Sequence, residues 1–224
     1  TYFDTSRVGS VLAVKIKGLG LPMSDIPMDK LRLHLSGDRS LAMDLYELLS
    51  SNVISTVFLG DAEQQVRVLS HSTITEVGFG SAESVLPDRE EASSAYRLLL
   101  EYFSFPEKFL YLDINELGQR PDSHTLTVLF GLDKPPSRTI NPSSHNFLVC
   151  CSPIVNLFPK TLEPVRLNHT DHQYTLQPEL GAPNNYEIHS VNMVSISSPA
   201  VAQMRNLEPY FGIKHKIGET IPDE

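Results

Sequence analysis

The sequence predicts a strand-rich α+β protein with two β-sandwich-like domains and a few covering helices. Three observations support this fold class. Many short segments alternate apolar and polar residues, turn residues separate them, and two segments have the apolar spacing of a helix. The 224 residues suffice for one large or two modest domains, and the composition, with 41% hydrophobic and 20% charged residues, is that of a globular chain.

In the first part of the chain, strands are expected at residues 11–17, 31–35, 53–59, 65–69 and 73–79. Asp38 is a good N-cap for a helix, and Asn52 can end that helix in a left-handed conformation. The apolar stripe of this helix consists of Leu41, Leu45, Leu48 and Leu49. Gly78 and Gly80 bracket Phe79 and predict a bend or a β-bulge.

The densest apolar and aromatic run lies at residues 96–114. Helical spacing over residues 92–103, with an apolar face so wide that little of the helix is polar, predicts a buried helix between the domains. Asp88 is its expected N-cap, and Pro106 should end it near Ser104. A strand should follow at residues 109–114.

The second part of the chain should contain strands at residues 126–132, 165–167, 173–176 and 187–196, and a surface loop at 133–144. Residues 145–158 suit a short helix or a strand.

We therefore expect a β-rich domain at 1–86, the central helix and its connection at 87–107, a second β-rich domain at 108–198, and the start of a further module at 199–224. The order of elements also suggests an internal duplication.

Charge and cysteine content exclude several function classes. A net charge of −9 argues against nucleic acid or an anionic membrane as the main partner. No apolar run is long enough to span a bilayer, and the start has no signal-peptide pattern. Because the first residue is not Met, we expect either a processed chain or, as the favoured interpretation, the middle of a longer protein. Cys150 and Cys151 are adjacent, so we expect two buried free thiols in a reducing compartment.

No motif predicts an enzyme or a cofactor. His169, Asp171 and His172 could supply ligands to Zn²⁺, but their spacing fits no standard site, and a polar turn between two strands is the favoured interpretation. A metal hydrolase that uses these three residues is the least favoured hypothesis. Nucleophile elbows, dinucleotide fingerprints and phosphate loops do not occur in the sequence.

Two kinds of segment are candidates for contacts with other subunits. Apolar and aromatic residues are typical anchors of interfaces, and loops on a rigid scaffold often carry function. The first kind includes the central run and the apolar stretch at 154–159, and the second includes the loops at 133–144 and 177–186. The candidate interface residues are Tyr102, Phe105, Asn156, Leu157, Phe158, Pro136, Arg138 and Tyr186.

Several sequence blocks, in order, resemble one known family. The most specific is Tyr-Arg-Leu-Leu-Leu-Glu-Tyr-Phe at 96–103, followed by Phe-Pro-Glu-Lys-Phe at 105–109. Further blocks lie at 31–38, 45–49, 78–87, 151–158, 163–165, 187–191 and 209–215. Together they resemble the middle portion of TssF, the type VI secretion baseplate subunit family also called VasA or ImpG.

The resemblance implies a structural subunit without catalytic residues or cofactors. It implies a cytoplasmic assembly docked at the inner-membrane secretion complex, with TssG, TssK, TssE, VgrG and a second TssF copy as partners. It implies neither nucleic-acid binding nor membrane insertion. The alternative is a β-sandwich module that binds carbohydrate or peptide, which exposed aromatic residues on a concave strand face would favour.

Overall fold

The computed structural model describes residues 2–4, 6–62, 65–87, 94–168, 170–178, 185–198 and 201–207. It divides into two compact units, Thr1–Ile154 and Val155–Glu224. Each unit is described separately. The α+β class is confirmed, because strands dominate and two α-helices accompany them in the described part of the chain.

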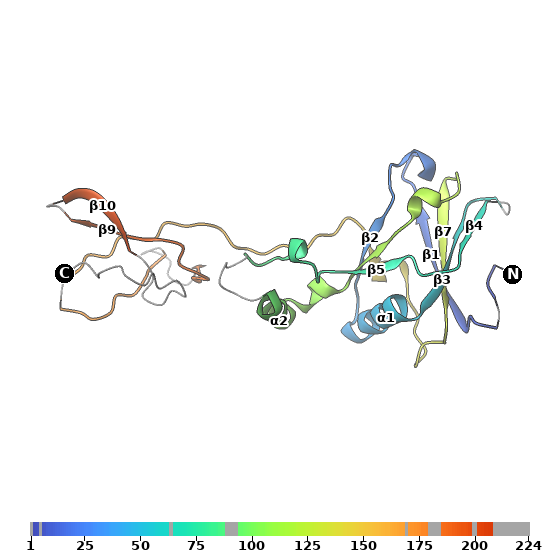
Figure 1. The fold of residues 1–224 in the computed structure, drawn as a ribbon, viewed down its shortest axis with the longest axis horizontal. Helices are drawn as coiled ribbons and strands as arrows, with labels where there is room; N and C mark the ends of the chain where they lie inside the picture. Colours follow the sequence, from blue (N-terminus) through green and yellow to red (C-terminus); the bar gives the residue numbers. More distant parts are fainter. Residues whose placement is uncertain are drawn as a thin grey trace, which may run out of the picture. The chain divides into compact units, whose positions relative to one another are not determined.

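The first unit contains two antiparallel sheets (Figure 1). The order of the first sheet is β1 (Ser10–Lys17), β7 (Thr125–Leu132), β3 (Val53–Leu59) and β4 (Val66–Leu69). The order of the second is β5 (Ile74–Val77), β6 (Tyr111–Ile114), β2 (Leu31–Leu35) and β8 (Phe147–Leu148). These strands lie where the alternating pattern predicts them, within one or two residues for most.

Helix α1 (Arg39–Ser51) packs against β2, β3 and β5 and so contacts both sheets. Its N-cap is Asp38, as expected, and the carboxylate accepts a hydrogen bond from the Ser40 backbone N–H. The expected left-handed end at Asn52 is wrong. Asn52 has right-handed angles, and its backbone N–H donates to the Leu48 carbonyl, so the last turn closes without αL geometry.

The hydrophobic core of the first unit forms between α1 and the two sheets. Its fully buried members include Leu45 of α1, Phe58 and Phe130 of the first sheet, and Leu112 of the second. Strand β6 is buried on both faces, so Tyr111 and Asp113 are buried as well. The sequence predicted the strand, but because it contains the charged Asp113 it did not predict that both faces are buried.

Five short 3-10 helices connect these elements in the described residues. They are η1 (Met23–Asp25), η2 (Ser81–Glu83), η3 (Pro106–Phe109), η4 (Leu117–Gln119) and η5 (Ser144–Asn146). Helix α2 (Ser94–Ser104) directly precedes η3. It ends at Ser104 as Pro106 predicts, whereas the expected N-cap, Asp88, lies outside the described residues.

The sheets do not follow the expected division at residues 86 and 108. Strands β6 and β7 come from the expected second domain, but they pair with β2, β5, β1 and β3 of the expected first domain. The physical reason is that antiparallel strands far apart in sequence satisfy each other's backbone groups. This interleaving also gives no support to the internal duplication, in which each copy would build its own sheet.

The second unit has little regular structure in its described residues. Strands β9 (Val194–Ser198) and β10 (Val201–Leu207) form an antiparallel pair. The strands expected at 165–167 and 173–176 are not formed, although the Glu163 backbone N–H donates to the Gln177 carbonyl across that segment. Of the strand expected at 187–196, only the last residues belong to β9. Alternation alone did not suffice, because a strand also needs a partner.

The two cysteines are free, but the expectation that both are buried is wrong. Cys150 is exposed and Cys151 is half-buried. Cys150 has a φ of 58°, so the chain turns in a left-handed conformation just after the short strand β8.

Candidate interaction surface

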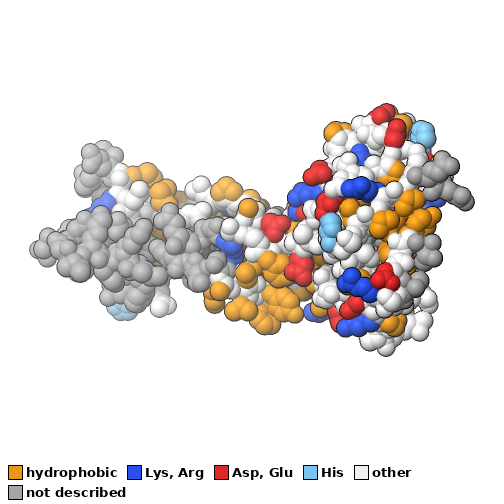
Figure 2. All heavy atoms as spheres, turned by 45° about the vertical axis from the view of Figure 1, so that its right-hand side comes forward, with side chains coloured by type: hydrophobic (Ala, Val, Ile, Leu, Met, Phe, Trp, Pro, Cys, Tyr) orange, Lys and Arg blue, Asp and Glu red, His pale blue; other side chains and the backbone are white. Residues whose placement is uncertain are grey.

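The apolar face of α2 is exposed, which corrects the expectation of a buried central helix. Tyr96, Leu99, Leu100 and Phe103 follow the spacing i, i+3, i+4 and i+7, so they form one stripe. Their exposed fractions are 65%, 57%, 43% and 79%. In Figure 2, hydrophobic side chains gather over the region of α2. Contiguous exposed apolar surface of this kind marks a binding site more often than a stable free surface.

A chain of aromatic rings extends this stripe toward β5. Phe79 lies 5.0 Å from Phe109, Phe109 lies 5.9 Å from Tyr102, and Tyr102 lies 5.5 Å from Phe103, measured between ring centroids. Phe109 is buried, whereas the other three rings are exposed. Such ring pairs hold one another in preferred geometries. We call Phe79, Tyr96, Leu99, Leu100, Tyr102 and Phe103 the α2 surface.

A tight backbone contact places Phe79 in this surface. Gly78 has a φ of 104°, and a Cβ at this position would lie 2.9 Å from the Lys108 carbonyl oxygen. Only glycine accommodates both the left-handed angle and the close approach. The bend expected at Gly78 is thus confirmed, and it brings the turn after β5 against η3.

The buried side of α2 is polar rather than apolar. Glu101 is 1% exposed, and it forms an ion pair with Lys108 of η3, which is also 1% exposed. Oε1 of Glu101 accepts hydrogen bonds from the backbone N–H groups of Val85 at 2.9 Å and Leu86 at 3.0 Å, and from the Ser84 hydroxyl at 3.1 Å. Burial by itself would raise the pKa of Glu101, but the hydrogen bonds from Leu86, Lys108 and Val85 outweigh it and lower the pKa.

The candidate residues from the central run and from the loop at 133–144 lie in different environments. Tyr102 belongs to the α2 surface, whereas Phe105 is half-buried and its backbone joins α2 to η3. Pro136 is half-buried, and Arg138 is exposed. The Arg138 guanidinium binds Asp44 and Ser40 of α1 at 2.5 Å each, so it already has partners within the unit.

The other candidates lie in the second unit. Asn156, Leu157 and Phe158 are exposed. The Phe158 ring meets the half-buried Tyr186 ring edge-on at 6.0 Å, and the Lys160 ammonium lies 3.7 Å from the centre of the Tyr186 ring. The structure therefore brings Phe158 and Tyr186 together, although they are far apart in sequence.

The sequence interpretation counted the central run among the candidates for subunit contacts, but it did not single out the exposed residues Tyr96, Leu99, Leu100, Phe103 and Phe79. The signal was the same wide apolar face that was taken as a sign of burial. Glu101 lies on the side of the helix opposite this stripe, and a charged residue there was the clue that α2 does not pack into an apolar core.

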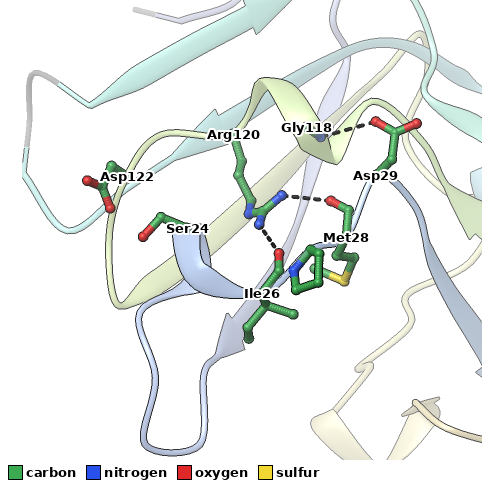
Figure 3. A pocket seen from close by; sticks show the side chains of 8 residues that line it. Ser24, Ile26, Met28, Asp29, Gly118, Arg120 and Asp122 are labelled. Atoms are coloured by element: carbon green, nitrogen blue, oxygen red, sulfur yellow. Dashed lines mark hydrogen bonds between the residues drawn. The ribbon is translucent and has the colours of Figure 1, made fainter.

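A pocket of about 520 Å³ lies between the loop that contains η1 and the region of η4 (Figure 3). Its charged centre, Arg120, is already engaged, because all five guanidinium N–H groups donate to backbone carbonyls. The acceptors are Met23, Ile26, Met28 and Leu117, at 2.5 to 3.1 Å. Arg120 therefore fastens the η1 loop and has no donor left for a ligand.

The histidine-rich turn was the sequence's best metal candidate. Its His169 lies outside the described residues. Asn168 organises the turn, since its side-chain oxygen accepts from the backbone N–H groups of Thr170 and Asp171 and from the Tyr174 hydroxyl. Within the described part of the chain, no three His, Cys, Asp or Glu side chains come together as a metal site would require.

Fold and surface together define a strand-rich α+β protein with one exposed helix face of apolar and aromatic residues. In its described residues, no helix has the length and apolarity to cross a membrane. The family model "Type VI secretion system, TssF" matches residues 3–222. The chain therefore belongs to the TssF family of type VI secretion systems.

Two known proteins are similar to this chain. The type VI secretion system component TssF1 of Pseudomonas aeruginosa is 26% identical over 215 residues, which cover 93% of this chain and 34% of that protein. A chain in the cryo-electron-microscopy structure of a TssK–TssF–TssG baseplate subcomplex matches with a TM-score of 0.60 and 20% identity, over 85% of this chain and 39% of that one. The chain thus spans about a third of the length of its curated relative.

Proposed function

We propose that this chain is part of a non-enzymatic structural subunit of the type VI secretion baseplate wedge, and that its α2 surface binds TssG. Membership of the TssF family supports the role in the baseplate. The solved structure with the same fold is described as a TssK–TssF–TssG baseplate subcomplex, which supports TssG and TssK as partners. The exposed stripe of α2 is the observation that supports docking at this place.

The α2 surface has the properties of an interface core. Its exposed residues are aromatic or leucine, and together they offer on the order of 600 Å² at ordinary side-chain areas. A standard interface buries about 800 Å² per partner, so a partner that covers α2 and its rim reaches the usual size. An apolar stripe at i, i+3, i+4 and i+7 is the pattern by which a helix enters a groove of another protein.

The wider assembly follows the same proposal. TssE, VgrG and a second TssF copy are further partners, and the assembly is cytoplasmic and docked at the inner-membrane secretion complex. The exposed residues Asn156, Leu157 and Phe158 and the loops at 133–144 and 177–186 are proposed as additional contacts. Since the Arg138 guanidinium already binds Asp44 and Ser40 of α1, we expect the loop at 133–144 to contact a partner through its shape rather than through an unpaired charge.

The carbohydrate-binding alternative receives less support. The exposed rings of the α2 surface lie on a helix and on the turn after β5, and not on a concave strand face. Exposed rings on a concave strand face would favour a carbohydrate-binding module, so a scaffold role accounts better for these rings.

The proposal is tested by co-purification of TssG with the complete protein. Leu99→Glu and Phe103→Glu place a charge in the stripe, and we expect each to lower the recovered TssG at least tenfold. Leu19→Glu is the matched control, because Leu19 is 95% exposed in a loop away from α2. Recovery of TssG at wild-type level with both stripe variants would overturn docking at α2. Loss of TssK with retention of TssG would overturn the choice of partner.

A further inference from the structure

The buried contacts of helix α2 are mainly polar, beside one ring contact between Tyr102 and Phe109, which is unusual for a helix with so many apolar residues. Among its described side chains, Glu101 is the buried one, and no α2 residue belongs to the hydrophobic core. Glu101 is therefore the side chain of α2 whose buried partners can fix the orientation of the helix.

Glu101 joins three segments through one carboxylate. Oε1 holds the Val85 and Leu86 backbone N–H groups and the Ser84 hydroxyl, all in the segment after η2. Oε2 holds the Lys108 ammonium from η3. Every oxygen of the carboxylate thus has a partner, as a buried charge requires.

We infer that Glu101 is the positioning residue of the α2 surface, with Lys108 as its charge partner. This inference rests on the proposed function, because it explains how the stripe is held outward for TssG. An apolar underside could slide or rotate by a turn at little cost. A carboxylate bound to two fixed backbone N–H groups and one ammonium has a single satisfied position, so it fixes the rotation of the helix.

The test uses charge variants in the complete protein. Glu101→Gln keeps an oxygen for the two backbone N–H groups but leaves the Lys108 charge unpaired, and Lys108→Met leaves the carboxylate without its cation. The double variant E101Q/K108M removes both charges and should recover part of the loss. Asp44→Asn is the control, because it breaks an exposed ion pair elsewhere in the unit, between Asp44 on α1 and Arg138 in the loop at 133–144.

Amide hydrogen exchange is measured separately for α2, for residues 84–86 and for β7, without any partner present. We expect Glu101→Gln and Lys108→Met to raise exchange of α2 and 84–86 at least tenfold while β7 stays protected. The control should change neither. Unchanged exchange in α2 would overturn the inference, and so would equal loss of protection in α2 and β7, because the pair would then only support global stability.

Binding of TssG by the same variants separates this inference from the proposed function. We expect Glu101→Gln to weaken binding at least tenfold. If Leu99→Glu abolishes binding but Glu101→Gln loosens α2 without weakening it, the surface binds TssG and the positioning role is wrong. If Leu99→Glu leaves binding intact, the docking proposal fails, and hydrogen exchange alone decides whether Glu101 fixes α2.

Discussion

Strand β7 and helix α2 are both rich in large apolar residues, yet these residues are buried in β7 and exposed in α2. Phe130 of β7 is fully buried between the sheet and α1, whereas Phe103 of α2 is 79% exposed. The difference lies in the neighbours. β7 has a hydrogen-bonded strand on each side, while α2 is held by an ion pair and leaves its stripe uncovered. Apolar density predicts that a segment needs a packing partner, but not that the partner belongs to the same unit.

The largest effect is expected on the buried side of this comparison. Phe130→Ala should lower the free energy of unfolding by about 4 kcal/mol, because it removes a fully buried ring and leaves a cavity. Urea unfolding followed by circular dichroism measures the change. A loss below about 1 kcal/mol would mean that the core around β7 is loosely packed, since cavity formation normally costs much more.

The substitution Arg120→Met should have the next largest effect on the free energy of unfolding. The side chain keeps its apolar stem but loses five hydrogen bonds, so the carbonyls of the η1 loop and of Leu117 must find water instead. We expect a loss of about 3 kcal/mol. Hydrogen exchange should increase in residues 23–28 before it increases in β7. Simultaneous increase in both would show that this loop is part of the cooperative core rather than fastened to it.

Acid should destabilise the second sheet through Asp113. Arg32 binds this buried carboxylate in a bidentate manner at 2.8 and 3.0 Å, and Lys30 binds it at 3.1 Å. The hydrogen bond from Arg32, opposed by burial and helped by Lys30, lowers the pKa of Asp113. The unfolded chain therefore takes up a proton more readily, so this stability is present above about pH 4 and is lost as the pH falls through the lowered pKa.

The variant Asp113→Asn isolates that contribution. It should cost about 2 kcal/mol at pH 7, because Arg32 and Lys30 lose a charged acceptor. It should also flatten the fall in stability below pH 4, which urea unfolding at several pH values measures. Glu101 has a lowered pKa too, so some acid sensitivity should remain. A variant with the same acid slope as the wild type would show that Asp113 is not the group that titrates.

Sequence reasoning predicted local structure well because local rules decide it. Asp38 caps α1, Pro106 limits α2, and Gly78 bends the chain, each through its own backbone chemistry. The division into domains could not be predicted in this way. It depends on which distant strands pair, and alternation says only that a strand has one apolar face.

The candidate surface was predicted only in part, because the burial of a helix, like the pairing of strands, depends on residues far away in the sequence. Tyr102 was named as an interface candidate, and it belongs to the exposed α2 surface, while its role in an interface stays a prediction. Burial of α2 was wrong, because the apolar pattern is identical for a core helix and for an interface helix. The position of Glu101 distinguishes the two here, because a buried carboxylate needs charged and hydrogen-bonding partners, and these take the place of apolar packing on the side of α2 that faces its unit.

The smallest effect on stability is expected where the sequence looks most hydrophobic. Phe103→Ser should change the free energy of unfolding of the isolated protein by no more than about 0.5 kcal/mol, because its ring already lies in water and covers little. Urea unfolding of the wild type and the variant, without TssG, measures this. The same substitution at Phe109, which is buried beneath the α2 surface, is the matched comparison and should cost about 3 kcal/mol or more. A loss above about 2 kcal/mol for Phe103→Ser would show that another part of the protein covers α2, and TssG would then have to bind elsewhere.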